Sequence, residues 1–221
     1  LRKALQLELK SLQQQVGITF VYVTHDQEEA LTMSDRIAVM ADGRVEQVGP
    51  PQEVYEEPTT TFVADFLGVS NLMTVTAKGE SNGRCRVALG DFELHAGNGD
   101  ISTTGDTRMV IRPERVRLEP HESTGENRVP AMVERVVYLG NANQVIMGLA
   151  HGERIQALVQ NTGDELAYRQ GDPVKAYLPP EALRVLTDTG TAPLEDDARA
   201  RPPGHPVEPA AQEASSPNVS I

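Results

Sequence analysis

Between residues 72 and 186, apolar residues alternate with polar ones in short runs, and turn-forming residues separate the runs. RCRVALG, for example, places Cys85, Val87 and Leu89 on one side of an extended chain, and the same period recurs in NQVIMGLA, RIQALVQ and PVKAYLP. A period of two predicts half-buried strands, and about eight strands at this spacing predict a small barrel or paired OB-like barrels. We therefore expect an all-β domain over residues 69–188.

The first 68 residues follow a different pattern. Residues 1–16 repeat leucine or valine at helical spacing, and Gly17 is placed to cap that helix. The run ITFVYV at residues 18–23 is apolar, β-branched and aromatic, which predicts a strand buried on both faces. A helix followed by such a strand is half of a parallel α/β unit. Because the helical pattern begins at residue 1, we expect the sequence to enter inside an element of a larger protein.

A histidine follows the predicted strand. His25 would lie at the carboxyl end of that strand, the edge of an open α/β sheet where ligands bind. Asp26 and Glu29 have the spacing of a capping box, which predicts a helix through Met33. By spacing alone, His25 could be a metal ligand, a general base, a phosphate contact or only the end of a strand.

Three more elements complete this segment. IAVM, ADGR and VEQV predict a strand, an Asp-Gly turn and a second strand. PPQEVYEEP opens with proline, as the first turn of a helix can. In TTTFVADFLG, Gly68 would end a helix, one face of which carries Phe62, Val63, Phe66 and Leu67.

This ordered series resembles the end of the ATP-binding subunit of ABC importers, in the branch with a C-terminal regulatory domain. THDQEEA at residues 24–30 matches the H-loop of that family, and the hairpin and closing helices match in order over residues 1–68. VIRPERVRL at residues 110–118 and GDPVKAYLPPEALRVL at residues 171–186 resemble the regulatory TOBE domain. The resemblance implies an α/β C-terminal remnant of a P-loop ATPase domain, followed by an all-β OB-like (TOBE) barrel.

The resemblance also implies a role for His25. In this family, the histidine senses the γ-phosphate of ATP and helps to orient the attacking water, and ATP with Mg²⁺ serves the intact subunit. The implied partners are a second ATPase subunit, in a homodimer that the β-domain helps to hold together, and transmembrane permease subunits. The implied location is cytoplasmic, peripheral to the inner face of the membrane.

The sequence departs from the family in what it lacks. It contains no G-x-x-x-x-G-K-[ST] loop, no LSGGQ-like signature and no Walker B strand. A phosphate-binding loop supplies the backbone N–H groups and the lysine that hold the phosphates. We therefore expect these 221 residues alone neither to bind ATP usefully nor to hydrolyse it, although the parent subunit is an ATP hydrolase.

Two other functions are open. The chain could be a stand-alone ligand-binding or regulatory β-module with a vestigial α/β segment. A metal hydrolase would need a zinc site built from His25, Asp26, Glu28 and Glu29, but those carboxylates are better explained as a helix cap and a solvated helix start. Within the importer family, the blocks resemble the spermidine/putrescine group more than the maltose group.

A charged cluster in the β-domain has two interpretations. Arg112, Glu114, Arg115 and Arg117 could form an anion site. The favoured interpretation is that they lie on the solvent face of a strand and pair with nearby acids. Cys85 alternates with apolar neighbours, which predicts a buried packing role.

Composition excludes several classes of function. The net charge is −12, tryptophan is absent and aromatic residues make up 4%, so we expect no nucleic-acid partner. The single cysteine excludes an intrachain disulfide and a Cys-clustered zinc site. Residues 189–221 contain six prolines and no aromatic residue, which predicts a disordered tail.

Overall fold

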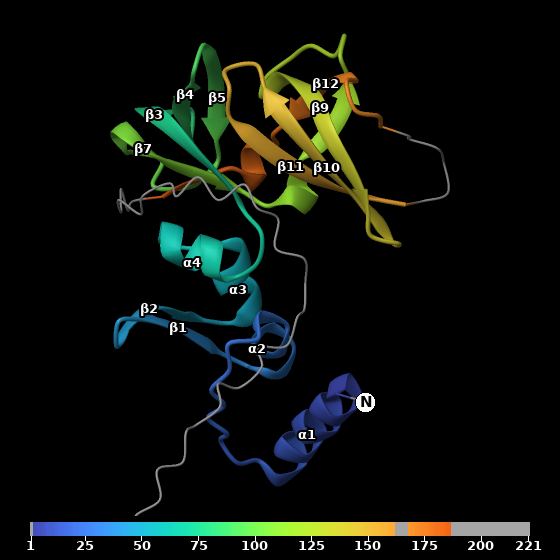
Figure 1. The fold of residues 1–221 in the computed structure, drawn as a ribbon. Coiled ribbons are helices and arrows are strands. Elements are labelled where there is room, and N and C mark those ends of the chain that lie inside the picture. The colour runs from blue at the N-terminus through green and yellow to red at the C-terminus, as the bar shows by residue number, and fades with distance from the viewer. Residues whose placement is uncertain (1, 162–167, 187–221) are drawn as a thin grey trace, which may run out of the picture. The chain divides into compact units, whose positions relative to one another are not determined.

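The computed structural model describes residues 2–161 and 168–186 (Figure 1). The predicted tail at residues 189–221 lies outside this part of the chain. The first 68 residues contain helices and one antiparallel hairpin. These elements are α1 (Arg2–Val16), α2 (Gln27–Met33), β1 (Ile37–Ala41), β2 (Arg44–Gly49), α3 (Pro51–Glu56) and α4 (Thr61–Phe66).

The rest of the described chain is built from strands and two short 3₁₀ turns. Its first half contains β3 (Asn71–Ser81), β4 (Arg84–Leu89), β5 (Phe92–Ala96), β6 (Asn98–Gly99), β7 (Thr104–Ile111), η1 (Pro113–Arg115) and β8 (Arg117–Pro120). Its second half contains β9 (Arg128–Tyr138), β10 (Ala142–Leu149), β11 (Arg154–Gln160), β12 (Pro173–Tyr177), η2 (Pro180–Ala182) and β13 (Arg184–Leu186).

Residues 18–23 do not form the predicted buried strand. They have no regular secondary structure and carry no ladder hydrogen bonds, and the side chains of Val21 and Val23 are each 90% exposed. A strand exists only beside another strand, and none of the described residues pairs with this segment. The parallel α/β sheet that the sequence predicts is therefore not seen.

The β1–β2 hairpin confirms its prediction. Asp42 and Gly43 both have positive φ, 48° and 76°, as a type I′ turn requires. The hairpin and the two helices after it share a small core made of Ile37, Val39, Val54, Val63 and Leu67.

The face of α4 that carries Phe62, Val63, Phe66 and Leu67 is only half buried, because Val63 and Leu67 are buried and the two phenylalanines are not. Val63 and Ala64 are fully buried, whereas Phe62 and Phe66 are 40% and 39% exposed. The two phenylalanine rings stack on each other, with centroids 5.7 Å apart. Ala64 packs with Val110 and Leu186, so α4 contacts the β-domain as well as the hairpin core, and this second contact turns the phenylalanines outward.

Two sheets make up the β-domain. One has five strands in the order β11-β10-β9-β12-β8, and the other has six in the order β5-β4-β3-β7-β13-β6. All pairs are antiparallel except β13 with β6. This is the all-β, OB-like architecture that the period-two pattern predicts, with more strands than expected.

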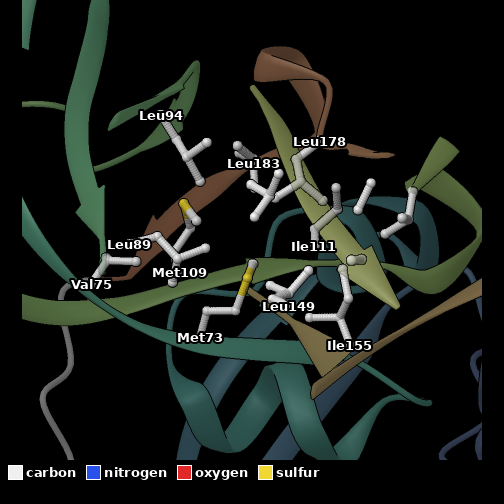
Figure 2. Close-up of a cluster of buried hydrophobic side chains, with 14 of the residues drawn as sticks. Met73, Val75, Leu89, Leu94, Met109, Ile111, Leu149, Ile155, Leu178 and Leu183 are labelled. Atoms are coloured by element: carbon white, nitrogen blue, oxygen red, sulfur yellow. The ribbon is translucent and has the colours of Figure 1, made fainter. Parts of the chain in front are cut away.

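A single core joins the two sheets. Figure 2 shows Met73, Leu89 and Met109 of the six-stranded sheet beside Leu149 and Ile155 of the five-stranded one. The alternation read from the sequence is confirmed on β4 and β10, where the inward residues are almost completely buried. Cys85 is fully buried in this core, as predicted.

None of the helices in the described residues has the length and hydropathy that a membrane crossing needs.

Candidate functional site

His25 lies in a bend between the irregular segment at residues 18–24 and α2. The helix begins as the Asp26–Glu29 spacing predicts, because the Asp26 carboxylate accepts a hydrogen bond from the Glu29 N–H at 3.2 Å. His25 precedes this cap, and its side chain is exposed. The helix cap therefore holds the backbone directly after the histidine at the start of α2.

The Thr24 hydroxyl braces the same bend from the other side. It accepts a hydrogen bond from the Asp26 N–H at 2.9 Å, which closes a short turn around His25. It also donates a hydrogen bond to the Glu29 carboxylate at 2.8 Å. The backbone on both sides of His25 is thus attached to the first turn of α2.

Glu29 is the central residue of this brace. Its side chain is buried, with 5% exposure, and accepts hydrogen bonds from Thr24, from the Tyr22 hydroxyl at 2.9 Å and from the Gln6 amide at 2.8 Å. A buried carboxylate needs such donors, because burial without partners is costly. The interpretation of Glu29 as part of a solvated helix start is therefore wrong. It connects α1, the irregular segment and α2.

A sequence signal for this brace exists in retrospect. Tyr22 and Thr24 alternate on one side of an extended chain, and both carry hydroxyl groups that point toward the acidic start of the next helix. Sequence patterning treats Glu29 only as a cap residue, since nothing in the pattern shows that α1 will cover it.

His25 itself makes no hydrogen bond or ion pair with the part of the chain that the structure describes. Its imidazole is therefore available to an external group. A histidine ring can donate a hydrogen bond to a phosphate oxygen. The γ-phosphate role stays a prediction, because this chain contains no phosphate-binding loop beside the turn.

The zinc hypothesis gains no support from this geometry. Asp26 caps a helix and Glu29 accepts three hydrogen bonds, so both carboxylates already have partners. Among residues 2–161 and 168–186, no group of three or more His, Cys, Asp or Glu side chains lies close enough to hold a metal ion.

The charged cluster after β7 is divided by burial. Glu114, Arg115 and Arg117 are exposed, and Arg115 lies 3.8 Å from the Glu56 carboxylate, as the solvent-face interpretation expects, but Glu114 and Arg115 lie on η1 rather than on a strand. Arg112 contradicts that interpretation, because only 6% of it is exposed. It lies at the start of η1 and bonds to residues of the first segment.

An anion site at this cluster is not supported. The depression there is lined by carboxylates as well as guanidinium groups, and the buried Arg112 is not among its lining residues. The lining consists of Glu114, Arg115, Arg117, Pro179, Glu181 and Ala182. The sequence pattern could not separate Arg112 from its neighbours, because its burial depends on contacts with α3 and α4.

Comparisons with known proteins agree with the motifs. Residues 109–186 match the family model of the TOBE domain. The spermidine/putrescine import ATP-binding protein of Rubrobacter xylanophilus is 48% identical over 178 residues, which cover 79% of this chain and 46% of that protein. The protein of the same name from Thermobifida fusca is 46% identical over 190 residues, covering 84% and 49%.

A third relative, from Ruegeria pomeroyi and of the same name, is 40% identical over 195 residues, covering 85% of this chain and 51% of that protein. The chain therefore spans about half the length of the curated relatives it matches. These matches confirm the resemblance that the motifs indicate.

Among solved structures, the cytoplasmic molybdate-binding protein ModG, with molybdate bound, matches 51% of this chain and 92% of its own. Its identity is 15% and its TM-score is 0.43, a likeness too weak to carry an argument.

Proposed function

We propose that this chain, which carries a TOBE domain and is similar over most of its length to spermidine/putrescine import ATP-binding proteins, supplies the C-terminal half of an ATP-binding subunit of an ABC importer. The observation that carries the proposal is the 40–48% identity over 79–85% of the chain. Such a subunit is an ATP hydrolase that energises transport.

His25 would be the contribution of this half to the nucleotide site. Its exposure supports this role, and so does the brace that fixes its turn through Thr24 and Glu29. In the intact subunit, we propose that the imidazole donates a hydrogen bond to the γ-phosphate of ATP. Phosphoryl transfer depends mainly on positioning and charge stabilisation, so a braced histidine suits it. Residues outside this chain would hold the remaining phosphates and Mg²⁺.

The partners follow from the same proposal. A second copy of the subunit would complete an ATP-bound dimer, with the β-domain helping to hold the two copies together. The subunit would bind permease subunits in the membrane and drive their conformational change by ATP hydrolysis. The proposed location is therefore the inner face of the cell membrane. Polyamine import is proposed from the names of the relatives alone, since an ATPase subunit does not touch the cargo.

A chimera tests the function. The chain would be joined in frame to the N-terminal half of the Rubrobacter xylanophilus relative and expressed with that organism's permease in a strain that lacks polyamine uptake. We expect uptake of labelled putrescine and phosphate release from ATP. We also expect His25→Ala to abolish both activities, because it removes the proposed γ-phosphate contact.

The control is His121→Ala, which changes an exposed histidine of the β-domain. This variant should keep full activity. An active chimera in which His25→Ala works as well as His121→Ala would contradict the role of His25. A folded chimera without ATP hydrolysis would contradict the ATPase proposal and favour the alternative, a stand-alone regulatory β-module. The self-contained β-domain core is the observation that favours this alternative.

A further inference from the structure

Arg112 is a buried cation whose hydrogen-bond partners all lie in one earlier stretch of the chain. It stands at the end of β7, yet its guanidinium donates only to residues between Tyr55 and Ser70. Burial lowers the pKa of Arg112, but an arginine stays charged at neutral pH. A buried charge of this kind needs hydrogen-bond acceptors, and the residues around Arg112 supply them.

The two edges of the guanidinium serve different helices. Nε and Nη2 donate to the Tyr55 carbonyl oxygen at 3.2 and 2.8 Å. Nη1 donates to the Ala64 carbonyl oxygen at 3.1 Å and to the Ser70 hydroxyl at 2.5 Å. One planar group therefore contacts the last turn of α3 with one edge and the last turn of α4 with the other.

These carbonyl groups are the ones that a helix leaves without partners. The last four C=O groups of a helix have no intrahelical donor, and the helix dipole makes that end negative. In a continued helix, the Tyr55 carbonyl oxygen would accept a hydrogen bond from the N–H of Thr59, four residues later. That N–H instead donates to the Gln47 side chain. The Ala64 oxygen accepts from the Ser70 hydroxyl at 2.7 Å in addition to Arg112.

The contact is reinforced around its edges. The guanidinium carbon lies 4.0 Å from the centroid of the Tyr55 ring, a cation–π distance, and the Tyr55 hydroxyl donates to Glu114 at 2.9 Å. Gly68 has a φ of +88°, and a Cβ at that position would come within 3.3 Å of the Tyr55 ring. Ring, glycine and arginine therefore fit closely.

We propose that Arg112 is a shared C-terminal cap for α3 and α4. Because one side chain caps both helices, we propose that the two helices detach from the β-domain together rather than one at a time. Separation of one helix would strip one edge of the guanidinium of its acceptors. A buried, partly unsatisfied charge is unfavourable, so the arginine would turn to water and release the other helix as well. This inference goes beyond the proposed function and holds whether or not the chain serves an ATPase.

Amide hydrogen exchange on the whole 221-residue protein tests the coupling. The probes are the N–H groups of Val54, Glu57, Ala64 and Leu67, which bond within or at the end of α3 and α4. In Arg112→Lys the charge remains but the two-edged fork is lost. We expect exchange at all four amides to rise by a common factor of about tenfold, the effect of losing charged hydrogen bonds of ordinary strength.

Ser70→Ala is the sharper variant, and it also covers the case in which Arg112→Lys fails to fold. It removes two hydrogen bonds, both on the α4 side: the one that the Ser70 hydroxyl donates to the Ala64 carbonyl oxygen and the one that it accepts from Arg112. Coupling predicts that exchange rises at Glu57 of the α3 end as well as at Leu67. A rise confined to the α4 probes, or no rise at all, would overturn the proposal.

Two other arginines provide matched controls. Arg128 makes a paired contact with Glu119 inside the β-domain and also lies over a tyrosine ring, so Arg128→Lys should leave all four probes unchanged. Arg184 bonds to the Pro58 carbonyl oxygen, in the loop between the helices, at 3.0 Å. If Arg184→Lys raised amide exchange at all four probes as much as Arg112→Lys does, any weakened contact between the helices and the β-domain would explain the result. Shared capping by Arg112 would then not be needed, and the proposal would fail.

Discussion

At the scale of single residues, a buried carboxylate organises the turn that presents His25. The Glu29 carboxylate accepts hydrogen bonds from Gln6 of α1 and from Tyr22 and Thr24 of the segment before the histidine. The Thr24 hydroxyl also accepts a hydrogen bond from the Asp26 N–H, so the backbone on both sides of His25 is held. The exposed imidazole is thus attached to a rigid turn. A rigid turn reduces the conformational entropy that the side chain and its backbone lose when the ring binds a ligand.

A substitution at Thr24 tests whether its hydroxyl holds the turn around His25. Thr24→Val keeps the shape of the side chain but removes the hydroxyl that bonds to the Asp26 N–H and to Glu29. We expect amide exchange at Asp26 to rise by about tenfold, as for the loss of one or two ordinary hydrogen bonds. Thr24→Ser restores the hydroxyl and should exchange as the wild type does. Equal protection in all three proteins would show that the turn does not depend on this bond.

Cys85 predicts how stability changes with pH. Burial raises the pKa of its thiol, so the folded protein holds this proton to higher pH than the unfolded chain does. The contribution to stability is complete below the thiol pKa of the unfolded chain, about 8.5, and is lost as pH rises above it. Urea unfolding between about pH 7 and about pH 9.5 should therefore show a steeper fall for the wild type than for Cys85→Ala. Parallel curves for the two proteins would contradict this assignment.

At the scale of elements, the predictions that succeeded are of two kinds: segments whose signals are local, and the strands of the β-domain, whose partners also lie within the described chain. The hairpin needs only the Asp42–Gly43 turn and its two strands, and α2 needs only its cap. The strand predicted over residues 18–23 failed because strands depend on neighbours, and the described chain offers none. Apolar content alone cannot show whether a partner is present.

The candidate site shows the same division. The sequence was sufficient to place His25 before a capped helix, because capping is local. It could not show that Glu29 is buried or that Arg112 differs from Arg115, since both facts come from contacts between distant segments. Nor does helical spacing show that Phe62 and Phe66 are exposed while Val63 and Leu67 on the same face are buried, since α4 packs against two neighbours.

The short parallel pair of β6 and β13 depends on one glycine. Gly99 has a φ of +83°, and a Cβ there would overlap the Val185 carbonyl oxygen. Gly105 has a similar φ of +90°, but nothing lies within 4 Å of its Cβ position. We expect Gly105→Ala to cost about 1 kcal/mol for its conformation alone, and Gly99→Ala to cost about 3 kcal/mol or more. Thermal or urea unfolding measures both, and equal losses would show that the close approach is unimportant.

At the scale of the whole molecule, the two segments have cores of unequal size. The core of the β-domain is drawn entirely from residues 73–185, whereas the first segment has a small core of its own. Burial of apolar area is the main favourable term in folding, so the larger core should suffice by itself.

A fragment of residues 69–188 tests this division. We expect it to unfold cooperatively and to keep strand-rich circular dichroism, because its core is intact. Residues 1–68 alone should show little cooperative structure, since their core contains only five buried side chains and the β-domain contact of α4 would be lost. A β-fragment without a cooperative transition would show that the helices are required for its folding.

The irregular run at residues 18–23 has a consequence for the behaviour of the chain in a test tube. ITFVYV is uncharged, free of proline and rich in β-branched and aromatic residues, and its side chains are largely open to water. Segments of this kind stack into cross-β fibrils when identical chains meet. A concentrated solution of the chain should therefore form aggregates that bind thioflavin, starting from the same six residues that precede the histidine turn.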